Sequence, residues 1–177
     1  DMILFECNKN TKQSSIKRIT GGVKMKAVVL HGPNDFATEE IKKPEIGDHE
    51  MLLKMRKAAI CGTDMRIFAG TKTKGIRYPS VVGHEMCGDI CEVGKEVEGF
   101  RAGDRVSIAN VIPCGSCPAC LEGRENACMN RKAIGYEFDG GFEEYVLLPE
   151  ILIKSGNVVK LPEDVSYTAG ALIEPLA

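Results

Sequence analysis

Four cysteines crowd one short stretch of this 177-residue chain, at positions Cys114, Cys117, Cys120 and Cys128. Two-residue gaps let neighbouring thiolates turn back onto one ion, and Gly115 and Pro118 help the backbone to make that turn. A structural zinc needs four soft ligands at tetrahedral corners, with sulfurs about 2.3 Å from the metal. The spacing therefore predicts a zinc lobe over about residues 110–132. Since all four corners are filled, we expect it to organise a loop and to perform no chemistry.

An iron–sulfur cluster, free thiols and disulfides all fit these cysteines less well than zinc does. A ferredoxin-like cluster also starts with three cysteines at two-residue gaps, but it expects Cys-Pro three residues later, where this chain has Gly123 to Asn126. Four thiols so close together without metal would be prone to oxidation. Disulfides are typical of secreted proteins, and the polar, basic start of the chain lacks the apolar run of an export signal.

The composition is that of an ordinary globular protein, with 44% apolar and 27% charged residues. A net charge of -2 gives no reason to expect a nucleic-acid or membrane partner. No apolar run approaches the roughly 20 residues that a membrane-spanning helix needs. The 19 glycines, beside few aromatic residues, favour a β-rich domain with many turns. We expect a cytoplasmic protein that is mainly β with short helices.

The chain divides near Met25. Residues 1–24 are polar, lack periodicity and end in Gly21-Gly22, so we interpret them as a disordered or loosely packed leader, either a remnant of cloning or a genuine extension. A domain over 25–177 should follow, because Met25–Leu30 has the composition of a strand. Further strands are expected at 51–60, 85–93, 105–109, 142–148 and 158–161, helical turns at 64–68, and a helix at 166–173 capped by Ser166.

A dinucleotide-binding segment is missing from these 177 residues. No Gly-x-Gly-x-x-Gly follows a strand and opens a helix, and no phosphate-binding loop of the Gly-x-x-x-x-Gly-Lys-Ser/Thr type occurs. The strand–helix alternation of such a domain is also not visible. We therefore expect no cofactor-binding residues in this chain.

A second metal site is suggested by Cys61, His84, Glu85 and Glu174. A catalytic zinc takes three protein ligands of mixed nitrogen, sulfur and oxygen character and leaves one corner open. Read one at a time, these residues are weak signals. A single cysteine after a strand is more often part of a core, and a single histidine is more often a hydrogen-bonded structural residue. A lone glutamate is usually solvated or salt-bridged.

The combination of motifs resembles the zinc-containing medium-chain alcohol dehydrogenase family. Gly83-His84-Glu85-x-x-Gly88-x5-Gly94-x-x-Val97 matches that family's signature at every fixed position. Cys61-Gly-Thr-Asp, the four-cysteine lobe and Gly140-Gly141-Phe-x-Glu-Tyr-Val appear in the family's order. The resemblance covers 25–177 and implies a GroES-like, partly open β-barrel. It also implies that a Rossmann domain binding NAD or NADP, and closing strands of the barrel, belong to sequence beyond this chain.

The resemblance assigns roles to individual residues. Cys61 and His84 match the family's catalytic zinc ligands, and Glu174 stands where the family has its third ligand. Glu85 matches a glutamate that can approach or replace a zinc ligand. Thr63 matches the hydroxyl that relays the alcohol proton.

Asp64 matches a carboxylate that orients the histidine, which is reasonable because a metal-bound imidazole usually donates its other N–H to an oxygen. The ending Glu174-Pro-Leu-Ala resembles the polyol, butanediol and threonine dehydrogenase branches more than the liver alcohol branch.

Three functions follow as hypotheses. The first is the catalytic domain of a zinc-dependent, NAD(P)-linked alcohol or polyol dehydrogenase, inactive by itself, whose full-length form is a homo-oligomer acting on a small-molecule alcohol. The second is a non-enzymatic zinc-binding scaffold on the same barrel, which has no need of the Cys61, His84 and Glu174 set. The third is an iron–sulfur carrier, which predicts visible absorbance.

The other histidines and cysteines receive simpler interpretations. His31 and His49 lie in polar, turn-like segments and should be solvated. Cys87 and Cys91 fall at even spacing on one expected strand, so we predict that both are core thiols on one face. Cys7, in the leader, has no visible partner.

Overall fold

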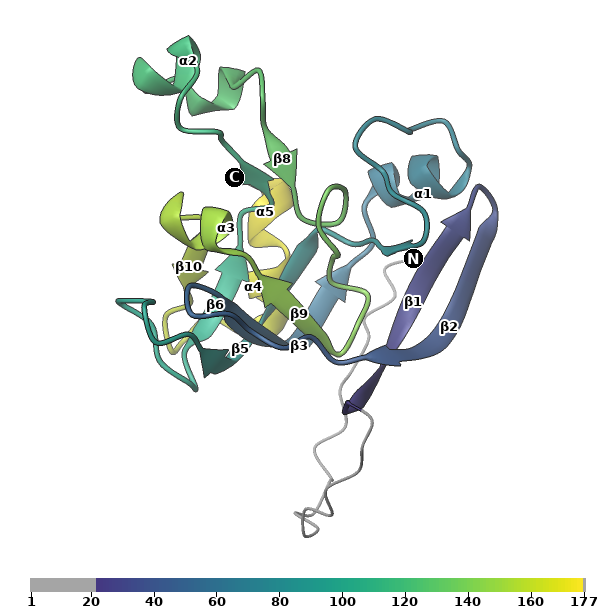
Figure 1. Ribbon diagram of the computed structural model, residues 1–177, viewed down its shortest axis with the longest axis horizontal. Helices are drawn as coiled ribbons and strands as arrows, with labels where there is room; N and C mark the ends of the chain where they lie inside the picture. Colours follow the sequence, from purple (N-terminus) through teal and green to yellow (C-terminus); the bar gives the residue numbers. More distant parts are fainter. Residues whose placement is uncertain (1–21, 177) are drawn as a thin grey trace, which may run out of the picture.

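A computed structural model describes residues 22–176 and shows antiparallel sheets decorated with short helices (Figure 1). The leader predicted over 1–24, with Cys7, therefore lies almost wholly outside the described residues, as does Ala177. The strands are β1 Lys24–Gly32, β2 Asp35–Lys42, β3 Met51–Ala59, β4 Ser80–Val81, β5 Glu85–Val93, β6 Arg105–Ile108, β7 Val111–Ile112, β8 Lys132–Ala133, β9 Tyr145–Leu148 and β10 Val158–Lys160. The helices are α1 Gly62–Phe68, α2 Pro118–Leu121, the 3-10 turn η1 Glu125–Ala127, α3 Glu150–Lys154, α4 Tyr167–Ala171 and α5 Ile173–Leu176.

Two main sheets form a partly open barrel. One has the order β10-β6-β5-β3-β9 and the other the order β2-β1-β4. They are joined by residues 142–144, since the Val28 N–H donates to the Phe142 carbonyl and the Met55 N–H to the Glu144 carbonyl. The predicted mainly β fold with a partly open barrel is thus confirmed.

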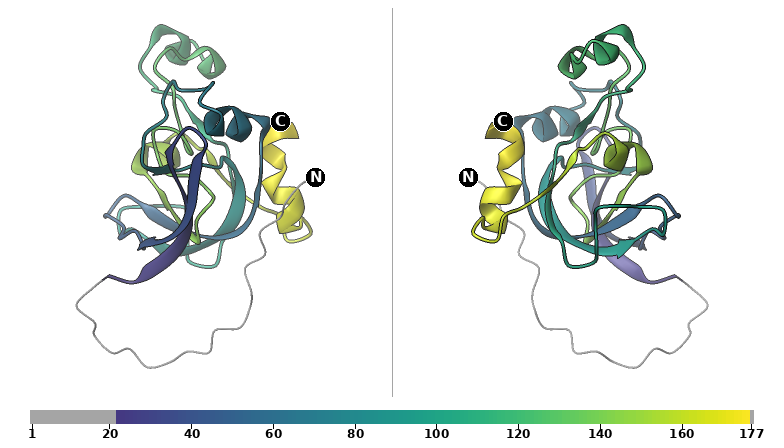
Figure 2. Two further views of the ribbon diagram at one scale, coloured as in Figure 1. Left: turned by 90° about the vertical axis from the view of Figure 1, so that its right-hand side faces the viewer. Right: turned by 90° about the vertical axis from the view of Figure 1, so that its left-hand side faces the viewer.

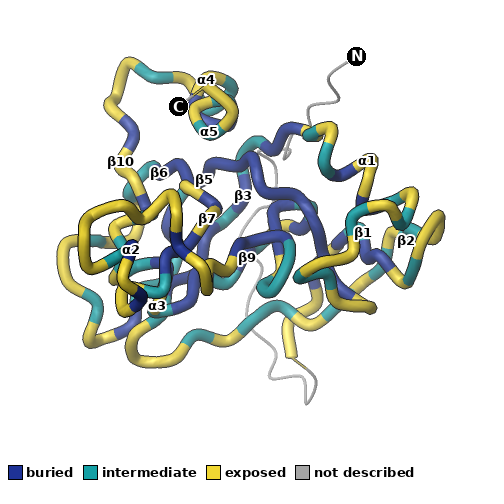
Figure 3. The backbone as a smooth tube through the Cα atoms, turned by 90° about the horizontal axis from the view of Figure 1, so that it is seen from above, coloured by how far each residue is buried: buried dark blue, intermediate teal, exposed yellow. Residues whose placement is uncertain are grey.

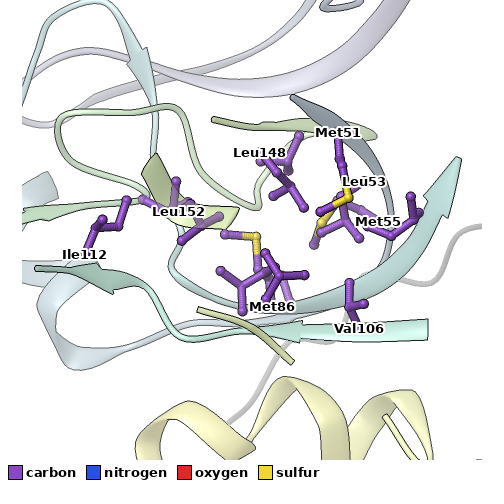
Figure 4. Close-up of a cluster of buried hydrophobic side chains, with 14 residues drawn as sticks. Met51, Leu53, Met55, Met86, Val106, Ile112, Leu148 and Leu152 are labelled. Carbon is purple, nitrogen blue, oxygen red and sulfur yellow. The ribbon is translucent and has the colours of Figure 1, made fainter. Parts of the chain in front are cut away.

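The core lies inside the five-stranded sheet, where the inward positions of β3, β5 and β9 are apolar. Met51, Leu53, Met86 and Leu148 are fully buried and point toward one another (Figure 4). Figure 3 shows the same pattern along the backbone, with β3 and the first half of β5 mostly buried and β2 alternating between exposed and intermediate residues. This burial supplies the framework on which the loops at the strand ends are held.

Helices α4 and α5 run together along one side of the barrel (Figure 2). Ser166 caps α4 as expected, because its Oγ accepts the Ala169 N–H. The Ser107 hydroxyl, buried in β6, donates to the Gly170 carbonyl over 2.8 Å, and the Tyr167 hydroxyl bonds to Asp89 of β5. These contacts fix the path of the chain toward Glu174.

The structure corrects several sequence-based expectations. The strand expected at 142–148 begins only at Tyr145, because residues 142–144 bend away to pair with β1. The helix expected at 166–173 ends at Ala171, and α5 follows as a separate turn. His31 is exposed, but it lies in β1 and pairs with Glu39. Cys91 is only half-buried, so of the two β5 cysteines Cys87 alone is a core thiol.

Candidate metal centres and the surrounding pocket

The four lobe cysteines converge as their spacing predicts. Their sulfurs all lie within 4.8 Å of one another. The Cys117 sulfur is 3.5 Å from that of Cys120 and 3.9 Å from that of Cys128. With metal–sulfur bonds of about 2.3 Å, the edge of a sulfur tetrahedron is roughly 3.8 Å long. The arrangement therefore fits a tetrahedral metal ion.

The lobe has little else to hold it together. Its buried cluster consists of Cys117, Ala119 and Cys128, with the other two cysteines packed against it, while Leu121 and Met129 are exposed. It stands away from the sheets on the short ribbon of β7 and β8 (Figure 1). Backbone and hydroxyl hydrogen bonds from Ser116 lower the pKa of Cys114 to about 6, which favours a thiolate there. A bound ion would replace the hydrophobic core that this segment lacks.

The second cluster starts at the N-terminus of α1. Cys61 is the N-cap, and its sulfur accepts the Thr63 N–H at 3.4 Å. Asp64, three residues on, reaches back so that its Oδ2 accepts the Cys61 N–H at 2.9 Å. This reciprocal capping box fixes the direction of both side chains at the helix start.

The position of His84 is fixed by the close packing of Gly83 against Gly140 and Gly141. Gly83 has φ of +95°, and the Gly141 N–H donates to its carbonyl over 2.8 Å. A Cβ on Gly140 would stand 2.1 Å from that same carbonyl oxygen, so only glycine fits there. The Gly140-Gly141-Phe142 motif therefore locks the loop that presents His84 and Glu85.

Cys61, His84 and Glu85 meet in this loop region. Their candidate ligand atoms lie within 4.8 Å of one another, and His84 and Glu85 are buried. The Nδ1 of His84 is 3.4 Å from the Oδ1 of Asp64, and neither atom has a well-aligned hydrogen bond among the described residues. With Nδ1 turned toward a carboxylate, the other ring nitrogen is left for a metal.

The acidic groups around His84 favour a positive charge at this cluster. Burial lowers the pKa of His84, but the nearby negative charge of the Asp64 carboxylate, together with Cys61, outweighs this effect and raises the pKa to about 9. The imidazole thus carries a proton in the absence of any other cation. A divalent metal ion would supply that positive charge instead and release the proton.

Glu174 approaches the cluster without joining it. It lies in α5, which packs against β5. Burial raises its pKa; the charge of Glu85 adds to that rise and the charge of His84 opposes it. The structure thus brings Glu174 into the neighbourhood of the cluster, while Glu85 is the carboxylate that meets Cys61 and His84 directly.

Tyr136 is a residue beside this cluster that sequence reasoning missed. Its ring centroid lies 5.6 Å from that of His84, tilted by 56°. Burial raises its pKa, with the charges of Asp64 and Cys61 adding to the rise, while a hydrogen bond with the Thr63 side chain lowers it. No motif surrounds Tyr136, and the only available signal was its position shortly before the Gly140-Gly141 pair.

We expect Asp64→Asn to weaken metal binding at the Cys61–His84–Glu85 cluster by about 10–100-fold, because an amide orients and polarises the imidazole less well than a carboxylate. Asparagine retains an oxygen that can accept the Cys61 N–H, so the thermal melt should change little. Competition with a chromophoric chelator measures the affinity. Asp48→Asn, at an exposed ion pair with Lys95, is the matched control. An unchanged affinity in Asp64→Asn would contradict the orienting role.

The fold and these two clusters define a zinc-type dehydrogenase domain, and comparison with known proteins agrees. The model of the alcohol dehydrogenase GroES-like domain matches residues 47–163. The chain belongs to this family, and relatives similar to it include dehydrogenases.

Individual relatives make the similarity more specific. L-threonine 3-dehydrogenase of Shewanella sp. (strain ANA-3) is 41% identical over 135 residues, which are 75% of this chain and 38% of that protein. A structure assigned as a zinc-binding dehydrogenase from Sinorhizobium meliloti 1021, bound to NADP, has a TM-score of 0.79 at 36% identity, covering 87% of this chain and 43% of that one. The structure of galactitol-1-phosphate dehydrogenase from Escherichia coli has a TM-score of 0.77 at 34% identity, covering 86% of this chain and 42% of that one. The chain spans about two-fifths of the length of the curated relatives that it matches.

Proposed function

We propose that this chain is the zinc-holding catalytic domain of an NAD(P)-linked alcohol or polyol dehydrogenase. The observation that carries the proposal is the meeting of Cys61, His84 and Glu85 within 4.8 Å, with Asp64 behind the imidazole. A scaffold gains nothing from this cluster, since buried ionisable groups are costly unless they serve a ligand. None of the described helices has the length and apolar character needed to cross a membrane.

In this proposal Cys61, His84 and Glu85 hold the catalytic ion, with Glu174 as a further or alternative ligand. A zinc ion in such a site lowers the pKa of a hydroxyl that it binds. Thr63 lies beside Cys61 and takes the proton from the alcohol, and its contact with Tyr136 extends the path. Asp64 keeps the imidazole in one tautomer and orientation.

Hydride acceptance belongs to a nicotinamide cofactor that this chain contains no motif to bind. Positioning of the cofactor against the substrate can account for roughly 7–11 kcal/mol of the barrier. We therefore propose that the 177 residues alone do not oxidise alcohols with NAD or NADP. The full-length protein is proposed to be a cytoplasmic homo-oligomer that acts on a small-molecule alcohol.

Metal analysis of the purified chain tests the proposal against a scaffold. We expect two zinc ions per chain, of which Cys61→Ser loses one while the lobe retains the other. Cys91→Ser, a half-buried thiol outside both clusters, is the control and should retain both. Cobalt substitution should give absorption bands from both sites; those of the Cys61 site should disappear in Cys61→Ser, and those of the four-cysteine lobe should remain. One ion per chain, unaffected by Cys61→Ser, would favour the scaffold.

A further inference from the structure

Two cations flank the proposed catalytic cluster and have no carboxylate partner among the residues that the structure describes. Arg66, in α1, donates from Nη2 to the Thr63 hydroxyl over 2.8 Å. Lys72, in the loop after α1, places its ammonium 4.8 Å from the centre of the Tyr136 ring and donates to the backbone carbonyl of Lys74. Neither Arg66 nor Lys72 forms a salt bridge within residues 22–176, whereas the next arginine, Arg77, is paired with Asp139.

Both cations point at the residues that would surround a reacting alcohol. Thr63 is the proposed proton relay, and the Tyr136 ring packs beside His84. Each cation therefore contacts one side chain beside the cluster, Arg66 that of Thr63 and Lys72 that of Tyr136. A divalent ion would already neutralise the Cys61 thiolate and the Glu85 carboxylate, so these cations are not needed for that purpose.

We propose that this site selects short alcohols that carry an anionic group, a phosphate or a carboxylate, which Arg66 and Lys72 bind while the hydroxyl faces the Cys61–His84–Glu85 cluster. This inference rests on the proposed function for the hydroxyl, but the anion site itself does not require it. Arginine and lysine without acidic partners are the groups that bind phosphate and carboxylate oxygens in proteins. A cation–π contact with the Tyr136 ring holds the Lys72 ammonium near the cluster rather than free in solvent.

Matched titrations of the zinc-loaded chain, followed by amide NMR shifts, test the selectivity. Glycerol 1-phosphate and glycerate are the anionic probes, and glycerol is the neutral one. We expect both anions to bind about tenfold more tightly than glycerol at low salt, with the advantage falling as salt is added. Lys72→Met and Arg66→Met should each remove most of this advantage without changing the affinity for glycerol. Lys95→Met, at an exposed pair with Asp48, should retain it.

Two further titrations distinguish this inference from the proposed function and from binding of a cofactor phosphate. Inorganic phosphate, added to the metal-free chain, should still shift the amides of residues 63–72 and 136; if it does while no alcohol responds to the metal, the proposed function fails and the anion site stands. Nicotinamide mononucleotide, compared with its nucleoside, tests whether the cations serve a cofactor phosphate instead. A larger gain for the mononucleotide than for glycerol 1-phosphate would overturn the proposal. So would equal affinity for glycerol and its phosphate, or an advantage that survives both substitutions.

Discussion

Glu143→Gln is expected to stabilise the chain at pH 8 by about 2–4 kcal/mol and to leave its stability at pH 5 nearly unchanged. Glu143 is 8% exposed and lines a cavity of about 290 Å³ between β1, β2 and β3, away from both cysteine clusters. Within the described residues its side chain forms no hydrogen bond or ion pair, and only burial and the charge of Asp139 act on its pKa. A buried carboxylate without a partner is costly, whereas the isosteric amide is neutral at every pH.

The sign follows from the raised pKa. Burial raises the pKa of Glu143 from 4.5 to about 9, and the charge of Asp139 adds to the rise. Between these values the folded chain holds a proton that the unfolded chain has released. The contribution of this group to stability is therefore fully present below pH 4.5 and is lost as the pH rises through about 9.

Urea unfolding of wild type and Glu143→Gln at several pH values between 5 and 9, with zinc held constant, measures this effect. Glu144→Gln is the matched control, because Glu144 is the exposed neighbour and bonds to the Lys26 N–H. Its stability should follow the wild-type pH dependence. Parallel pH curves for wild type and Glu143→Gln would show that the Glu143 carboxyl is not held neutral in the fold.

Cys128→Ser should abolish zinc binding in the lobe, with a loss of affinity beyond the roughly 100-fold that changes outside the ligand shell produce. A hydroxyl is a poor replacement for a thiolate, and Cys128 alone links the far arm of the lobe to the other three cysteines. The lobe should then lose protection from proteolysis between Val111 and Ala133, because its apolar side chains Leu121 and Met129 are exposed and form no core.

The barrel should survive this change, since its core contains none of the lobe cysteines and takes only Ile112, at the base of the lobe, from that segment. Zinc content, limited proteolysis and the melt of the sheet would be followed together. The half-buried thiol of Cys91 again offers a cysteine-to-serine control that should keep full zinc. Retention of the lobe zinc by Cys128→Ser would refute the structural role.

The sequence predicted those parts of the protein that depend on neighbouring residues. The lobe cysteines lie close along the chain, so their spacing alone brings the sulfurs together. The strands β1, β3 and β5 were predicted because their residues are apolar and β-prone over a full strand length. β2 was missed, since Asp35–Lys42 is polar and takes its conformation from pairing with β1.

Only the tertiary structure decided the features that join distant segments. Cys61 and His84 are brought together by the close crossing of Gly83 and Gly140, and the same crossing gives Glu85 a more direct place in the cluster than Glu174. No local sequence pattern predicts that Tyr136 lies beside His84, that Lys72 lies over the Tyr136 ring, or that Glu143 is buried. Spacing along the chain determines a site whose ligands share one loop, whereas charge, burial and proximity between loops are properties of the packed barrel.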